Sequence, residues 1–256
     1  MGKINKSTRL LTCLAILVFV STFTVRDAIA QDDNQSRILS MSQFTIKGGH
    51  EMQFREGVSA WKTCYLEHDG EWEWNMWSRV QGEGTVYALT SYMNNWAEMD
   101  DNDDEAGAAC QSLAQNMIVP HVDNSERNMA RTMPEISKAP TTDMDVISAT
   151  YWRVNNSTKF MDTIESVISA IRQAEGEPRG FWFDLVGGDL NAPHYFVVTP
   201  FANFAAMDSP MDGVWDVVEE TNNKKTRDQL QADYRDSVDQ VWSFMWRRVG
   251  ELSHAN

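Results

Sequence analysis

Two ten-residue stretches decide the fold: Ser91-Tyr-Met-Asn-Asn-Trp-Ala-Glu-Met-Asp100 and Thr199-Pro-Phe-Ala-Asn-Phe-Ala-Ala-Met-Asp208. Asn, Ala, Met and Asp recur at matching places, 108 residues apart, and a tryptophan is replaced by phenylalanine. Residues 38–46 match 146–154 at the same spacing, and residues 129–137 match 245–253 at a spacing of 116. Three matching blocks in the same order indicate an internal duplication, with eight extra residues before the last block of the second copy.

Each copy predicts the order strand, helix, strand, strand, helix, strand. In the first copy we expect strands at 38–46, 72–80, 86–92 and 127–133, and helices at 50–68 and, in two stretches, from 94 to 119. The turn Gln81-Gly-Glu-Gly84 joins the middle strands as a hairpin. The second copy repeats the pattern at 146–154, 157–174, 180–187, 194–200, 211–242 (helical) and 244–250. This is the order of the ferredoxin-like unit, whose two helices cover one face of a four-stranded antiparallel sheet.

The uncovered face of each sheet needs a partner, because an apolar sheet face is unstable in water. The expected fold class is therefore α+β, with two tandem ferredoxin-like βαββαβ repeats packed sheet to sheet as a pseudo-dimeric α+β barrel. We expect a first repeat at 31–137, a linker at 138–145 containing Pro140, and a second repeat at 146–256.

The chain resembles the dimeric α+β barrel superfamily, which includes monooxygenases of the antibiotic-biosynthesis type. The resemblance lies in Gly49-His-Glu-Met-Gln-Phe54 before the first helix, and in Met93-Asn-Asn-Trp-Ala-Glu-Met99 and Phe201-Ala-Asn-Phe-Ala-Ala-Met207 after the third strand of each copy. It covers residues 38–253 and implies a central cavity between the two sheets. These motifs are typical of the fold and do not specify an activity.

Two cysteines follow the N-terminal segment, and they are either bonded or separately buried. In the fold that the resemblance implies, Cys64 lies late on the first helix and Cys110 on the second. Both helices pack on the same sheet face, so a Cys64–Cys110 disulfide is expected.

The first thirty residues predict a cleaved secretory signal peptide. Three basic residues precede an apolar run from Leu10 to Phe23, and Ala28-Ile29-Ala30 is a small-x-small cleavage site. The expected location is periplasmic or secreted. No later stretch is apolar enough to cross a membrane.

The charge of the mature chain excludes two classes of partner. The full sequence has 22 basic and 37 acidic residues, and the predicted mature chain has 18 and 36, a net charge of −18. Such a surface repels nucleic acid and anionic lipid. The sequence leaves the oligomeric state open, a homo-oligomer included.

Aromatic residues on the expected strands are the first candidates for the cavity. Trp77, Trp152 and Trp182 lie on strands, where they either fill the core or line a site for an apolar or aromatic ligand. The chain has ten tryptophans, enough for either role, and packing is the commoner role of such residues.

Polar residues at matching strand positions are the second group. Tyr87 and Tyr195 match on the third strands, and Arg131 and Arg247 on the fourth. Arginine can hold a carboxylate or enolate, and His194 can move a proton near neutral pH. The alternative places these side chains at the rim of the sheet, with their polar ends in water.

The sequence offers no metal motif and no nucleophile motif. The five histidines lack the spacing of a zinc site, and the acidic run Asp100–Glu105 lacks the pattern of a calcium loop. Haem ligation by His121 is disfavoured, because the first strand lacks the asparagine that related haem-degrading proteins use. No metal and no cofactor is therefore expected.

The favoured function is binding of a small apolar or aromatic ligand in the cavity between the sheets. Two alternatives stay open. One is a cofactor-independent monooxygenase or isomerase acting in the same cavity, and the other is a structural or partner-binding module without a ligand.

Overall fold

The computed structural model describes residues 35–100, 104–141 and 144–255. The predicted signal peptide lies outside the described residues. The strands are β1 (Ile38–Ile46), β2 (Asn75–Arg79), β3 (Thr85–Met93), β4 (Val122–Thr132), β5 (Val146–Val154), β6 (Phe181–Gly187), β7 (Tyr195–Phe201) and β8 (Val238–Arg248). The helices are α1 (Glu51–Glu67), α2 (Glu105–Ala109), α3 (Gln111–Leu113), α4 (Ser157–Glu175), α5 (Val214–Thr221) and α6 (Lys224–Ser237).

The eight strands form a closed antiparallel barrel in the order β1-β3-β2-β8-β5-β7-β6-β4. The first four strands of the chain are joined to the last four by two strand pairs, β2 with β8 and β4 with β6. The two sheets thus meet edge to edge through backbone hydrogen bonds, and their inner faces oppose each other across the barrel. Because the barrel is closed, it has no free edge strand that could pair with another chain and cause aggregation.

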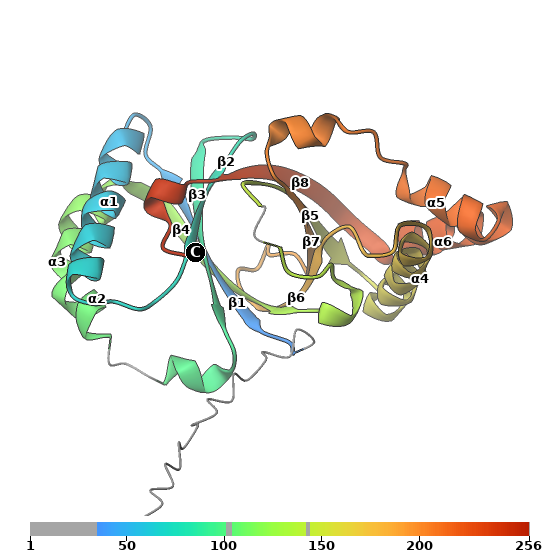
Figure 1. Cartoon of the computed structure of the whole chain (residues 1–256), viewed down its shortest axis with the longest axis horizontal. Coiled ribbons are helices and arrows are strands. Elements are labelled where there is room, and N and C mark those ends of the chain that lie inside the picture. Colours follow the sequence, from blue (N-terminus) through green and yellow to red (C-terminus); the bar gives the residue numbers. More distant parts are fainter. Residues whose placement is uncertain (1–34, 101–103, 142–143, 256) are drawn as a thin grey trace, which may run out of the picture. The chain divides into compact units, whose positions relative to one another are not determined.

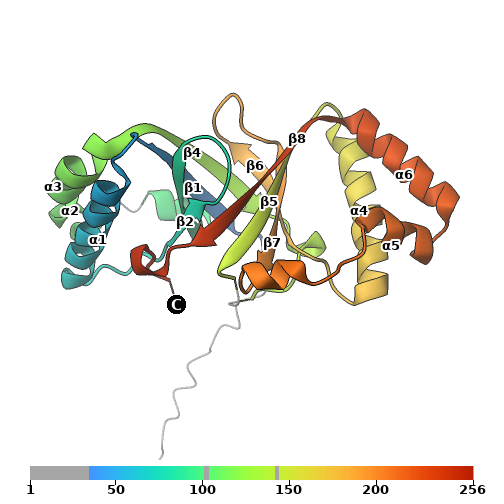
Figure 2. The ribbon, with the colours of Figure 1, turned by 90° about the horizontal axis from the view of Figure 1, so that it is seen from above.

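Helices cover the outside of the barrel on two opposite sides, α1 to α3 on one and α4 to α6 on the other (Figures 1 and 2). Because side chains alternate along a strand, one set points to the helices and the other into the barrel. The helix-facing sets form one core around Phe54 and Tyr87 and another around Trp152 and Phe160, and a smaller cluster surrounds Tyr65 and Trp74. Other residues close one end of the barrel interior with apolar packing, among them Leu39, Trp77, Ala149, Phe183, Phe196 and Trp246.

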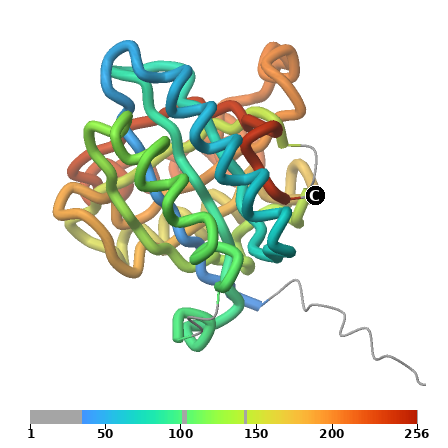
Figure 3. Tube along the Cα trace, turned by 90° about the vertical axis from the view of Figure 1, so that its left-hand side faces the viewer, coloured from blue at the N-terminus to red at the C-terminus, as the bar shows by residue number. Residues whose placement is uncertain are grey.

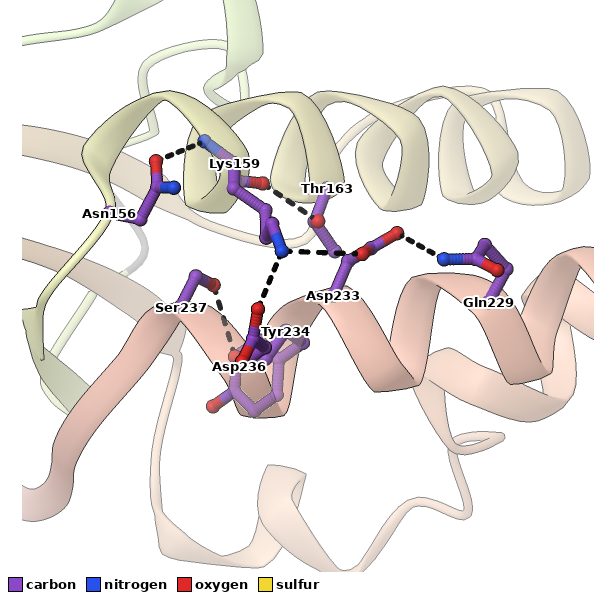
Figure 4. Close-up of polar contacts among 8 residues, drawn as sticks. All are labelled: Asn156, Lys159, Thr163, Gln229, Asp233, Tyr234, Asp236 and Ser237. Carbon is purple, nitrogen blue, oxygen red and sulfur yellow. Dashed lines mark hydrogen bonds and ion pairs between the residues drawn. The ribbon is translucent and has the colours of Figure 1, made fainter.

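The helix layer of the second half is fixed by caps and ion pairs (Figure 4). Asn156 accepts a hydrogen bond from the Lys159 backbone N–H at the start of α4, and Gly176 ends that helix with a φ of 91°. The Lys159 ammonium lies 2.6 Å from an Asp236 carboxylate oxygen and 3.8 Å from one of Asp233. These contacts tie α4 to α6 through partly exposed groups, so packing contributes more stability than charge.

The helix layer of the first half depends on a close backbone approach and a disulfide. A Cβ on Gly57 of α1 would lie 2.1 Å from the Met117 carbonyl oxygen, so only glycine fits. Cys64 and Cys110 are bonded, with Cα atoms 6.0 Å apart, and link α1 to the end of α2. The predicted disulfide is therefore confirmed. Figure 3 shows these helical segments lying over the strands.

The sequence-based element boundaries are close for most elements and wrong at β8, β4 and β2. The helix expected over 211–242 is two helices, α5 and α6, and residues 238–242 belong to β8. The helix passes into the strand at Ser237 and Val238 without a loop, so no Gly or Pro marks the change. Strand β4 begins at Val122, earlier than the expected residue 127, and β2 is shorter than expected. None of the helices in the described ranges is long and apolar enough to span a bilayer.

Candidate functional site

One end of the barrel interior contains a cavity of about 350 Å³. This volume lies in the range of about 300–1,000 Å³ that small-molecule sites occupy. It is lined by strand residues and by the loop between β6 and β7: Gln43, Thr45, Arg79, Val86, Asn124, Glu126, Asn128, Tyr151, Asp189, Asn191, Ala192, Pro193, Trp242 and Phe244.

The wall contributed by β1 and β4 is polar. Gln43 on β1 pairs across the strands with Glu126 on β4, and Asn128 lies two residues further along β4. All three line the cavity, and Asn128 is buried. This wall therefore offers two amides and one carboxylate as hydrogen-bonding groups.

The wall contributed by β5 and β8 is aromatic. Tyr151 on β5 pairs with Trp242 on β8, and their rings stack with centroids 5.7 Å apart and planes 13° apart. Phe244 follows on β8, and its ring centroid is 6.3 Å from that of Tyr151. An offset aromatic surface of this kind favours a planar apolar ligand.

These two walls face each other across the barrel. In the closed strand order, β1 and β5 are four places apart in a ring of eight, and so are β4 and β8. Strands four places apart in such a ring lie on opposite sides. A ligand in the cavity would therefore contact amides and a carboxylate on one side and aromatic rings on the other.

Arg79 supplies a positive charge between the two walls. Its guanidinium carbon lies 4.8 Å from the centroid of the Phe244 ring, and one terminal nitrogen donates to the Glu83 carbonyl oxygen. Its Nε is buried and has no hydrogen-bond partner. Within the described part of the chain, no carboxylate forms an ion pair with it. Burial lowers the pKa of Arg79, but a guanidinium stays charged in proteins.

The Tyr151 hydroxyl keeps its proton at ordinary pH. Burial raises the pKa of Tyr151 to about 12, and the Trp246 indole and the Arg79 charge offset only part of the effect. The Tyr151 hydroxyl can therefore donate a hydrogen bond, and it does not act as a base near neutral pH.

The loop at 188–193 borders the mouth of the cavity and is held from two sides. The Asn128 side-chain oxygen accepts a hydrogen bond of 3.0 Å from the Asp189 backbone N–H. On the other side, Arg153 reaches the Ala192 carbonyl oxygen at 3.4 Å. A Cβ on Gly188 would lie 1.9 Å from the Asn128 oxygen, so this contact requires glycine. The polar wall therefore also positions the loop.

Most of the predicted cavity residues lie on the other face of the sheet. Only Trp77 points into the barrel, where it packs in the filled part, and its indole N–H donates to Thr90. Tyr87 packs under α1, and its hydroxyl contacts Arg55 and Glu51. The residues Tyr195, Trp152 and Trp182 pack in the core beneath α4. Their placement in the cavity is corrected, because strand alternation directs them toward the helices.

The three predicted polar candidates at the rim do not reach the cavity either. Arg131 and Arg247 are exposed on the outer face, each one residue from an inward-facing neighbour. His194 is exposed, and its Nδ1 accepts a hydrogen bond from the Val154 N–H. Arg131 and Arg247 therefore lie in solvent on the outside of the barrel, and His194 binds the backbone of β5 there.

The sequence contained a signal for the residues that were missed. Trp242, Phe244 and Trp246 stand at every second position, as side chains on one face of a strand do. The predicted strand began at residue 244, so Trp242 fell in the helical prediction over 211–242. Glu126 and Asn124 were missed because the last strand of the first copy was started too late.

The site residues do not fit a haem. Haem iron needs an axial ligand such as His, Cys, Met or tyrosinate. The cavity lining contains only Tyr151 of these types, and its raised pKa disfavours tyrosinate. His121 lies outside this cavity, with its ring against His50.

The acidic run also has a structural role where it is described. Asp104 accepts a hydrogen bond from the Gly107 N–H at the start of α2, and residues 101–103 lie outside the described ranges. In the rest of the described chain, the one group of three metal-type ligands is Cys64, Cys110 and His68, whose thiols form the disulfide.

Comparison with known proteins identifies the fold. No family model matches the sequence, and no curated protein matches it either. Similar solved structures include a "putative monooxygenase" of Lactobacillus acidophilus NCFM, with 11% identity, a TM-score of 0.50, and 83% of this chain and 94% of that chain covered. Another is a "putative monooxygenase" of Fusobacterium nucleatum, with 12% identity, a TM-score of 0.49, and 83% and 92% covered.

A third similar structure is a heme-binding protein of Thermus thermophilus, with 10% identity, a TM-score of 0.47, and 86% and 93% covered. At these identities the likeness concerns the fold alone. The protein has the dimeric α+β barrel fold, as the sequence resemblance implied.

Proposed function

We propose that the barrel binds a small aromatic ligand that carries a polar or anionic group. The observation that carries this proposal is the opposition of an aromatic wall, Tyr151 and Trp242, to a polar wall, Gln43 and Glu126, in one cavity. Sites of this volume typically combine an apolar surface with a few placed polar groups that fix orientation.

The ligand ring is expected to lie against Trp242 and Phe244. Each aromatic contact of this kind adds about 0.5–1.5 kcal/mol beyond the burial of area. The polar edge of the ligand then faces Gln43 and Asn128. Arg79 lies beside Phe244 with an unpartnered Nε, so an anionic substituent is favoured there.

Catalysis in the same cavity is the second candidate, and one observation favours it. Glu126 can accept a proton on the polar wall, while Tyr151 on the opposite wall keeps its hydroxyl proton. Proton removal from a phenol or an acidic C–H bond is the step that a cofactor-independent monooxygenase or isomerase requires. Oxygen uptake or isomer formation that is lost in Glu126→Gln would support this function.

Tryptophan fluorescence tests ligand binding directly. A panel of hydroxylated and carboxylated aromatic compounds is titrated into the mature chain, and saturable quenching with one site is expected. Trp242→Phe should weaken the quenching and the affinity, whereas Trp72→Phe should not, because Trp72 is exposed outside the barrel. Absence of any binder in the panel would favour the third alternative, a structural or partner-binding module.

We also propose that the halves are tandem ferredoxin-like repeats at 31–137 and 146–256, joined by the linker 138–145. Support comes from matching registers: Ile38 pairs with Arg131 in the first half, and Val146 pairs with Arg247 in the second. The same spacings of 108 and 116 appear in the sequence blocks. Expression of each repeat alone, followed by mixing, tests whether the two halves assemble as a pseudo-dimer.

Export is proposed on the sequence of residues 1–30, and the disulfide supports it, because such bonds persist in oxidising compartments. Cleavage after Ala30 is tested by sequencing the N-terminus of the secreted or periplasmic protein. A homo-oligomer stays a prediction, tested by analytical ultracentrifugation.

A further inference from the structure

A pair of histidines lies outside the lining of the proposed ligand cavity. His50 precedes α1, and His121 ends the helical turn before β4, 71 residues later in the chain. Their Nδ1 atoms are 2.9 Å apart, and the ring centroids are 5.2 Å apart. Both residues are half-buried.

Backbone hydrogen bonds hold the two histidines together. The Lys47 N–H donates to the His121 carbonyl oxygen at 3.0 Å, and the His50 N–H donates to the Lys47 carbonyl oxygen at 3.0 Å. The same short segment therefore fixes both residues. When the protein already holds the ligand side chains in place, binding of the ion costs less conformational entropy.

The separation of the two nitrogens fits two ligands of one metal ion. Nitrogen ligands at about 2.0–2.1 Å, separated by 90° at the metal, lie about 2.9 Å apart, whereas a tetrahedral angle places them about 3.3 Å apart. We propose that His50 and His121 bind a divalent transition-metal ion of tetragonal geometry, such as Cu²⁺, through their Nδ1 atoms. The competing explanation is a simple hydrogen bond, in which one ring donates a proton to the other.

Water is expected to complete the coordination. The nearby Glu51 carboxylate accepts a hydrogen bond from the Tyr87 hydroxyl at 2.7 Å, and the Lys47 ammonium donates to the Pro120 carbonyl oxygen at 2.8 Å. The His pair belongs to no group of three candidate metal ligands among the described residues. The strongly acidic chain nevertheless attracts cations.

The second half, as far as the structure describes it, carries no equivalent pair. At the repeat spacings of 108 and 116, Thr158 and Ser237 stand where the first half has His50 and His121. One ion per chain is therefore expected, with two imidazole nitrogens as its protein ligands.

The test is a titration of the tag-free mature chain with copper(II) chloride, followed by calorimetry and electron paramagnetic resonance. One equivalent should bind, with hyperfine structure from two imidazole nitrogens. His50→Gln and His121→Gln should each weaken binding at least tenfold and remove that two-nitrogen signature. His68→Gln and His254→Gln are matched controls and should bind as the wild type does.

Three results would overturn the proposal. They are no binding at millimolar copper, an unchanged signature in both His50→Gln and His121→Gln, and loss of binding only in a control variant. Circular dichroism establishes that each variant is folded. If a Gln variant unfolds, protection of the wild-type pair by copper against histidine modification by diethyl pyrocarbonate gives the same answer, because bound metal blocks both rings.

Discussion

Tyr151 on β5 stacks against Trp242 on β8. At the spacings of 108 and 116 residues, this pair corresponds to Gln43 and Glu126, which pair across β1 and β4. The two halves of the barrel thus place opposite chemistry at matching positions. Since the strands concerned lie across from each other, one asymmetric cavity results. A ligand that fits both walls has a single orientation, and the next prediction depends on that orientation.

Replacement of Arg79 should separate charged from neutral ligands. In Arg79→Gln, an aromatic carboxylate should bind about ten- to a hundredfold more weakly, since a charged hydrogen bond contributes about 1.5–3 kcal/mol. The corresponding neutral amide should bind almost as before. Isothermal calorimetry with the matched pair of ligands measures both, and Arg248→Gln is the control, because Arg248 pairs with Asp145 outside the cavity lining. An equal loss for both ligands would contradict the role of the charge.

The loop at the mouth should respond to a single methyl group. Gly188→Ala places a Cβ against the Asn128 oxygen and should break its hydrogen bond to the Asp189 N–H. We expect faster ligand dissociation and a loss of about 1–3 kcal/mol in the free energy of unfolding. Gly187→Ala is the matched control, since nothing lies within 4 Å of its added Cβ. Stopped-flow fluorescence measures dissociation, and equal rates in both variants would contradict the loop contact.

The disulfide should be complete and stabilising. Non-reducing mass spectrometry should show the loss of two hydrogens, and Cys64→Ser/Cys110→Ser should unfold at lower denaturant. The bridge spans 46 residues, and the chain-entropy model gives about 4 kcal/mol for such a loop, with measured values commonly about 2–4 kcal/mol. Two thiols that alkylate in the native protein without reductant would contradict the bond.

The α+β barrel was predictable from the sequence because several independent sequence signals agreed on it. The matching blocks that end in Asp100 and Asp208 and the strand and helix periodicities both predicted the order βαββαβ. These signals depend on short stretches of sequence and on the spacing of apolar residues, and both can be recognised in a single sequence. The strand pairs that close the barrel were harder to predict, because the pairing of β2 with β8 depends on strand edges that carry no distinctive residues.

The candidate site was mostly missed, and strand alternation is the reason. A shift of one residue moves a side chain from the cavity to the helix face. Tyr87 and Tyr195 were chosen because they match in the two repeats, yet both pack under helices. The residues that make the cavity asymmetric, Glu126 and Trp242, differ between the repeats, so matching positions could not reveal them.

The titration of Tyr151 provides the last prediction. Its pKa is raised from 10 to about 12, so the folded state holds this proton more tightly than the unfolded state does. The stabilisation is fully present below about pH 10 and is lost as the pH rises from about 10 to 12, on the order of 2 kcal/mol in total. Urea unfolding at pH 9 and pH 11.5 should therefore show a larger loss for the wild type than for Tyr151→Phe.

Absorbance at 295 nm should give the same result independently. The difference between the wild-type and Tyr151→Phe titrations isolates one tyrosine, which should ionise near pH 12. A bound ligand that accepts a hydrogen bond from Tyr151 should delay this ionisation further, because it favours the protonated hydroxyl. Ionisation of this tyrosine near pH 10 would mean that water reaches the aromatic wall freely, and the case for an apolar ligand surface at Trp242 would fail with it.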